Sequence, residues 1–121
     1  MEKLANRQVL ILGGPGIATT TSYDVSQFFR DFLSLPTLVV EAVENSGSAD
    51  CDVTVEASVD GVVFSTVLAF TTLTASGTEP KALPMQARYM QITVTLSAAG
   101  DWDVNVYAIA PMANAQGALL P

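Results

Sequence analysis

The sequence predicts an all-β protein, an antiparallel β-sandwich with jelly-roll or Greek-key connections. Three stretches carry this prediction, because in each of them apolar and polar residues alternate with the period of two that half-buries a strand. They are residues 52–68, 87–96 and 102–110. Turn residues separate these and several shorter segments, and the sum of about seven or eight short strands is typical of a small sandwich.

The segment 52–67 is the one around which the rest of the chain is organised. Its first strand carries valine or alanine at every odd position from 53 to 59. Asp60-Gly61 then supplies the residue pair that favours a tight hairpin turn. The predicted return strand continues the alternation with Val62, Phe64, Thr66 and Leu68.

The N-terminal part begins with residues 1–6, which we expect to form an arm, and continues with a short apolar strand at 8–12. The glycine-rich segment 13–16 does not fit a phosphate-binding loop, because no Gly-Lys-Ser/Thr follows and Pro15 lacks a backbone donor. We interpret it as a plain turn. The threonine-rich segment 17–24 favours an edge strand or an extended segment.

The period changes over residues 25–33, which are predicted to form one short helix. Their apolar side chains are spaced i, i+3, i+4, i+7 and i+8, as on one face of a helix. Asp24 and Gln27 fit a capping box, and Pro36 ends the segment. We expect the helix to close one end of the core, with a ligand pocket as the alternative. The spaced residues are Val25, Phe28, Phe29, Phe32 and Leu33.

The second half of the sandwich starts with a strand at 37–43 that is apolar on both faces. It is therefore either central in its sheet or in contact with a neighbouring subunit. Residues 71–84 contain Gly77, Pro80 and Pro84 and predict a long connection that is too broken for a long strand. In the last predicted strand, Trp102 and every second residue after it point inward.

We expect residues 7–110 to form a single domain. Residues 111–121 are expected to form a C-terminal tail that is either docked or disordered.

Composition limits the possible partners. Only 14% of the residues are charged while 50% are hydrophobic. Either apolar surface left over after folding needs a partner, or the chain has a small, alanine-rich core. The net charge is −7 and the five basic residues are scattered, which argues against nucleic-acid binding. No apolar run has the length of a membrane span, and no secretory signal is recognisable. We therefore expect synthesis in the cytoplasm and no membrane association. The final location stays open, because virion proteins are also made without signals.

The chain contains few of the side chain types that enzymes use for catalysis. It has no histidine and a single cysteine, Cys51, which we interpret as a packing residue. The aspartate pairs at 50 and 52 and at 101 and 103 could bind calcium if they met, or they are solvated loop carboxylates. We expect no enzymatic activity, no catalytic or metal-binding residue and no cofactor.

A resemblance adds to this interpretation. The segment Ser58-Val-Asp-Gly-Val-Val-Phe64, the strand Val55-Glu-Ala-Ser58 before it and the later Ala87-Arg-Tyr-Met-Gln-Ile-Thr-Val94 resemble discoidin-like and carbohydrate-binding-module-like β-sandwiches. Tyr23-Asp-Val-Ser-Gln-Phe28 is similar to the lead-in of that group. Sandwiches of this kind without a signal peptide resemble virion proteins of tailed bacteriophages, such as head decoration and tail accessory proteins.

This resemblance implies a non-enzymatic virion protein, a capsid decoration (cement) protein that stabilises a phage head. It would bind the major capsid protein or another virion protein and form a homo-oligomer, with a trimer favoured. The alternative is a tail or baseplate accessory protein or a carbohydrate-binding module for host attachment, in which aromatic rings stack on sugars. The candidate ligand or partner contacts are Trp102, Tyr23, Tyr89, Tyr107, Leu119 and Leu120.

Overall fold

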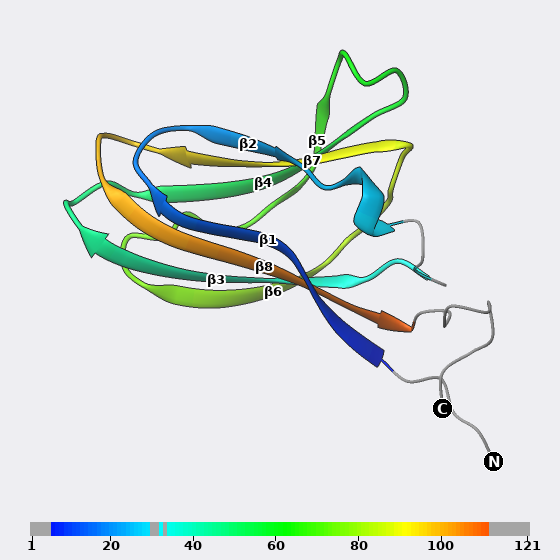
Figure 1. Cartoon of the computed structure of the whole chain (residues 1–121), viewed down its shortest axis with the longest axis horizontal. Coiled ribbons are helices and arrows are strands. Elements are labelled where there is room, and N and C mark those ends of the chain that lie inside the picture. Colours follow the sequence, from blue (N-terminus) through cyan, green and yellow to red (C-terminus); the bar gives the residue numbers. More distant parts are fainter. Residues whose placement is uncertain (1–5, 30–31, 33, 112–121) are drawn as a thin grey trace.

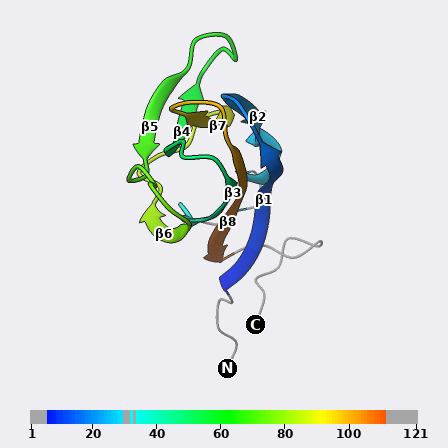
Figure 2. The same ribbon diagram turned by 90° about the vertical axis from the view of Figure 1, so that its left-hand side faces the viewer.

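The computed structural model describes residues 6–29, 32 and 34–111, and confirms the all-β sandwich. Two antiparallel sheets of four strands each lie face to face (Figures 1 and 2). Sheet A has the order β1-β8-β3-β6 and sheet B the order β2-β7-β4-β5. The strands are β1 (Asn6–Ile17), β2 (Thr21–Asp24), β3 (Thr37–Ser46), β4 (Cys51–Ser58), β5 (Ser65–Ala69), β6 (Gly77–Ala82), β7 (Tyr89–Leu96) and β8 (Asp101–Pro111).

The strand pairing is nested. β4 pairs with β5, β3 with β6, β2 with β7 and β1 with β8, all antiparallel. The chain is therefore one long hairpin, centred between β4 and β5, that is rolled into two layers as in an eight-stranded jelly roll. The predicted organisation around the 52–67 hairpin corresponds to this centre.

The core lies between the sheets and follows the predicted alternation. In β7 and β8, every second side chain is buried, including Met90, Ile92 and Val94 in β7 and Trp102 and Val104 in β8. β3 is central in sheet A, between β8 and β6, which agrees with its apolar character on both faces. Its inward residues Leu38 and Val40 are fully buried, while Val39 on the other face is half-buried.

The glycine-rich segment 13–16 is not the plain turn that we predicted. β1 continues through it to Ile17, with irregularities in register between Leu10 and Leu12 and between Gly14 and Ile17. A Cβ atom on Gly14 would lie 2.8 Å from Ile17 Cδ1, so glycine lets the bulged strand pack closely. Pro15 is tolerated because β1 is an edge strand.

The helix predicted for residues 25–33 is a single 3-10 turn, Ser26–Phe29, and residues 30, 31 and 33 lie outside the described part. Asp24 does cap this turn, accepting a hydrogen bond from the Ser26 amide at 3.0 Å. The Ser26 hydroxyl accepts the Met90 amide at 2.8 Å, which fastens the segment to β7. Such side-chain to backbone bonds compete with helix formation. Phe29 and Phe32 still enter the core, with ring centroids 5.7 Å apart.

Two further expectations were wrong. The return strand β5 begins at Ser65, so Asp60-Gly61 is part of a wider loop and neither Val62 nor Phe64 belongs to a strand. Only Gly61 in this loop has a positive φ, of 79°, whereas a tight hairpin turn of the predicted kind needs a positive φ at both central residues.

The connection 71–84 contains β6, in which Pro80 is accommodated because β6 is also an edge strand.

Candidate functional site

The outer face of sheet A carries a row of apolar residues that crosses all four strands. Leu10 of β1 is in register with Tyr107 of β8, Tyr107 with Val39 of β3, and Val39 with Pro80 of β6. Register partners lie on the same face of a sheet. Since the neighbours of these residues along β8 and β3 are buried, the row points away from the core. Leu10 is 47% exposed.

A second row, two residues further along the strands, extends this apolar surface. It consists of Gln8, Ile109, Thr37 and Ala82 and carries no charge. The row on the other side contains Glu41 and Asn105 and is polar. A shallow groove of about 250 Å³ between them is lined by Gln8, Val39, Glu41, Tyr107 and Ile109. We call the apolar surface the sheet A face; its members are Leu10, Val39, Pro80, Ala82, Tyr107 and Ile109.

The outer face of sheet B has the opposite character. Apart from Tyr89 and Ala69, its outward positions are occupied mainly by serine, threonine, glutamine and carboxylates, several of which bond to one another across the strands. The Ser22 and Thr93 hydroxyls are 2.8 Å apart, and Gln91 Nε2 donates to Glu56 Oε1 at 3.0 Å. The apolar sheet A face is therefore a specific property of one side of the sandwich.

A second exposed apolar element lies at the end of the β4–β5 hairpin. The loop of residues 59–64, which we call the valine loop, projects from the body of the sandwich (Figures 1 and 2). Val59, Val62 and Val63 are 84%, 80% and 69% exposed. They were assigned to strands in the sequence-based prediction. The adjacent pair Val62-Val63, which breaks the alternation, is the signal that could have placed them in a loop.

Hydrogen bonds to two side chains fix the backbone of the valine loop. Asp60 Oδ1 accepts the amides of Val62 and Val63 at 2.8 and 3.0 Å, and the hydroxyl of Ser58 at 2.8 Å. The Ser58 hydroxyl oxygen in turn accepts the Gly61 amide at 2.9 Å. The donated amides lower the pKa of Asp60 to about 2, with those of Val62 and Val63 contributing most.

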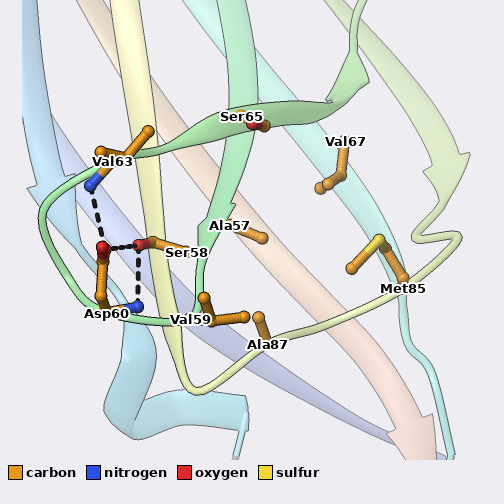
Figure 3. A pocket seen from close by; sticks show the side chains of 9 residues that line it. All are labelled: Ala57, Ser58, Val59, Asp60, Val63, Ser65, Val67, Met85 and Ala87. Atoms are coloured by element: carbon orange, nitrogen blue, oxygen red, sulfur yellow. Dashed lines mark hydrogen bonds between the residues drawn. The ribbon is translucent and has the colours of Figure 1, made fainter.

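The valine loop borders a groove of about 370 Å³ that opens beside β5 (Figure 3). Val59 and Val63 line it from the loop, Val67 from β5, and Met85 from the segment before β7. Met85 is 47% exposed, so the wall opposite the loop is also apolar. Together with Ala57, Ser58, Asp60, Ser65 and Ala87, these residues form what we call the β5 groove.

The predicted contact residues do not gather in one place. Trp102 is fully buried and donates from Nε1 to the Ala49 carbonyl at 3.2 Å, so it offers no surface to a ligand or partner. Tyr23 packs against the core from β2. Tyr107 belongs to the sheet A face. Leu119 and Leu120 lie outside the described residues.

Tyr89 borders a polar pocket of about 420 Å³ near the start of β7. Asp24, Asp60, Phe64 and Gln91 are among its lining residues. The Arg88 guanidinium carbon lies 5.4 Å from the centroid of the Tyr89 ring, a cation–π arrangement that covers part of the ring.

At least one carboxylate of each aspartate pair accepts a hydrogen bond, at the end of the sandwich opposite the Tyr89 pocket. Asp103 Oδ1 accepts the Gly16 amide at 2.7 Å, which lowers the pKa of Asp103, and Asp52 accepts the Thr72 hydroxyl. Within residues 6–29, 32 and 34–111, no three potential metal ligands gather into a group. The structured part of the chain also has no helix with the length and hydrophobicity that a bilayer span requires.

Cys51 is fully buried at the start of β4, in agreement with its interpretation as a packing residue. Burial, with a smaller contribution from the charge of Asp52, raises the pKa of its thiol to about 11. The reactive thiolate is therefore scarce at neutral pH.

Comparisons with known proteins define the class of fold. No protein family model matches the chain, and no curated protein matches it in sequence. A solved chain of the Bacillus endospore appendages, which are disulfide-linked pili, has a similar fold: the TM-score is 0.53 at 13% identity, covering 88% of this chain and 86% of that chain. The Yersinia pseudotuberculosis-derived mitogen gives a TM-score of 0.47 at 8% identity, covering 99% and 96%. The first likeness places the chain among antiparallel β-sandwiches.

Proposed function

We propose that the protein is a non-enzymatic structural protein that docks through its sheet A face onto a larger protein assembly. The observation that carries the proposal is the apolar row from Leu10 through Tyr107 and Val39 to Pro80. Contiguous exposed apolar surface of this kind marks interaction sites in soluble proteins.

The charge distribution gives the docking an orientation. The sheet A face can lose its water at low cost, because none of its six members is charged. The carboxylates and hydroxyls of sheet B, among them Asp24 and Glu56, would lose hydration if they were covered. The chain as a whole carries a net charge of −7. We therefore expect sheet A to face the assembly and sheet B to face solvent.

In its narrower form, the proposal is a capsid decoration (cement) protein of a tailed bacteriophage, located in the virion and bound to the major capsid protein. Its support is the sequence resemblance described above. The Bacillus appendage chain with a similar fold forms part of a pilus, so this architecture is compatible with assembly into a large protein structure.

The test is co-sedimentation with capsids assembled from the major capsid protein of the same genome. We expect wild-type protein to bind, and the double variant Leu10→Gln/Tyr107→Gln to lose binding by roughly tenfold or more, as expected for central apolar contacts. Thr95→Gln, an exposed position on the sheet B side, is the matched control and should bind normally. Absence of binding by the wild type would reject the assignment as a decoration protein. Equal binding by the wild type and both variants would reject the sheet A face as the docking surface.

The carbohydrate-binding alternative has one observation in its favour, the polar pocket beside Tyr89. Its aromatic ring, two aspartates and a glutamine are the groups that sugar sites use, and the pocket volume lies in the range of small-ligand sites. Trp102 cannot contribute because it is buried. Glycan-array binding that is lost in Tyr89→Ala and retained in Tyr107→Ala would favour this alternative over docking.

A further inference from the structure

The valine loop combines exposure with rigidity. Its three valines contribute little to the core, yet the Ser58 and Asp60 side chains hold the backbone that presents them. An apolar side chain on an ordered backbone loses less conformational entropy on binding than one on a mobile loop. The loop therefore has the properties of a preorganised contact surface.

The β5 groove beside the loop selects for an uncharged apolar partner. Asp60 is the one ionisable side chain that lines it, and its Oδ1 already accepts three hydrogen bonds, two from amides of the loop and one from the Ser58 hydroxyl. The remaining walls are formed largely by valine, alanine and methionine side chains. An acidic segment would lose hydration here without gaining a cationic partner, and a basic segment would meet only Asp60, whose charge the hydrogen bonds of the loop already stabilise.

The backbone next to the groove is also suited to an extended segment. Among the strands of the described residues, β5 is the last in sheet B, so the outer edge of Ser65–Ala69 pairs with none of them. Lys81 Nζ donates to the Ala69 carbonyl at 3.1 Å, at the end of β5 away from the valine loop. An exposed sheet edge can bind an added strand through backbone hydrogen bonds, while pockets beside it select side chains.

The chain itself contains a segment of matching chemistry. Residues 112–121, Met-Ala-Asn-Ala-Gln-Gly-Ala-Leu-Leu-Pro, have no charged side chain although the whole chain carries a net charge of −7. They include the leucine pair Leu119-Leu120. The other terminal segment, residues 1–5, contains Glu2 and Lys3 and fits the groove less well.

The arrangement of the fold favours an intermolecular contact. β8 ends at Pro111 in sheet A, whereas the valine loop belongs to sheet B, and both views place the two on opposite sides of the sandwich (Figures 1 and 2). Ten extended residues reach at most about 33–36 Å. The groove of an adjacent copy that lies within this length of Pro111 can receive the segment directly, while reaching its own groove would require the segment to pass around the sandwich.

We propose that the β5 groove and valine loop of one copy bind the C-terminal segment 112–121 of a neighbouring copy, with Leu119 and Leu120 between Val63 and Met85. The contact goes beyond docking through the sheet A face and uses a different surface, so either can fail without the other. Because each copy donates a segment and receives one, the contact can close a ring or extend a chain of subunits.

The decisive test places a nitroxide spin label at the end of the tail, through Pro121→Cys. Cys51 is fully buried and should stay unlabelled. Nitroxide-labelled Pro121→Cys protein at natural isotope abundance is mixed with wild-type protein that carries ¹³C-labelled methyl groups and no nitroxide. We expect selective broadening of the Val59, Val63 and Met85 methyl signals, with the exposed Val43 unaffected.

Two results in this experiment would overturn the proposal. One is unchanged groove methyl signals at high protein concentration. The other is broadening that is absent from this mixture but present in a second sample whose chains each carry both nitroxide and isotope, which would mean an intramolecular contact. The same label on a Leu119→Ser/Leu120→Ser chain is the control, and it should leave the groove signals sharp.

Native mass spectrometry and sedimentation provide a second readout. We expect Val59→Thr/Val63→Thr and Leu119→Ser/Leu120→Ser each to raise the dissociation constant of self-association by roughly tenfold or more. Val43→Thr, which alters a 46% exposed valine on β3, is the matched control and should have no effect. Val59→Thr/Val63→Thr keeps an intact C-terminal segment, and Leu119→Ser/Leu120→Ser keeps an intact groove. A mixture of the two variants should therefore restore one contact per pair. Self-association that is unchanged in both variants would contradict the groove, whatever the outcome of the capsid experiment.

Discussion

The hydroxyl of Ser58 donates a hydrogen bond of 2.8 Å to the carboxylate of Asp60, two residues further along the chain. The same carboxylate oxygen accepts the amides of Val62 and Val63, so two side chains order a loop that projects into solvent. The exposed valines of this loop therefore occupy defined positions, and its order depends on a small number of replaceable groups.

Asp60→Ala should accelerate hydrogen exchange at the amides of Val62 and Val63, because both lose their acceptor. Asp60→Asn is the matched control, since its amide oxygen can still accept and should retain part of the protection. Amides in β7 should exchange at the wild-type rate in both variants. Equal exchange of the loop amides in Asp60→Ala and wild type would show that the carboxylate does not order the loop.

Acidification should destabilise the protein through Asp60. Its folded-state pKa is about 2, below the ordinary value of 3.8, so its contribution to stability is complete above pH 3.8. That contribution should decline as the pH falls from 3.8 towards 2 and be absent below 2. The pKa values of Glu79 and Asp103 are also lowered, by amides of Thr71 and Gly16, and act in the same direction.

An NMR titration of the side-chain carboxyl carbons provides the measurement for this pH dependence. The Asp60 signal should titrate with a midpoint near 2, and urea unfolding of Asp60→Asn should lose less stability than the wild type between pH 4 and 2. A midpoint near 4 for Asp60 would be incompatible with the hydrogen bonds described here.

Trp102→Phe should lower the free energy of unfolding by about 2–4 kcal/mol. The smaller ring leaves space in the core, and the Ala49 carbonyl loses the donor Nε1. Tyr107→Phe, on the outer face of β8, is the control and should change stability by less than about 0.5 kcal/mol. Urea denaturation followed by circular dichroism measures both; similar values for the two variants would contradict the burial of Trp102.

Cys51 should react with thiol reagents only when the protein unfolds, because it is fully buried and its thiol pKa is raised to about 11. The rate of modification by an aromatic disulfide at pH 8 should therefore be far lower in buffer than in urea. Cys51→Ser should destabilise the protein more than Cys51→Ala, since a hydroxyl buried without a partner costs about 1–3 kcal/mol. Rapid modification of the native protein would contradict this placement.

The sandwich could be predicted from sequence where burial alternates strictly. β7 and β8 are such strands, because one face meets the core and the other does not, and every second residue from Met90 and from Trp102 is apolar. The apolar residues on both faces of β3 left two alternatives, a central position in its sheet or contact with a neighbouring subunit. The structure shows the central position.

The misassigned segments depend on contacts between residues far apart in the chain. β6 is a strand despite Pro80 because it pairs with β3 at an edge, which local propensity cannot indicate. Ser26 forms hydrogen bonds with Met90, 64 residues away, and the helical pattern of residues 25–33 carries no sign of them. The sheet A face depends on the register of four strands, so it could not be predicted before their order was known.

Asn6 pairs with Pro111, at the two limits of the β-sandwich. β1 therefore cannot pair until β8 has been synthesised, so sheet A is completed only after all the strands between them have left the ribosome.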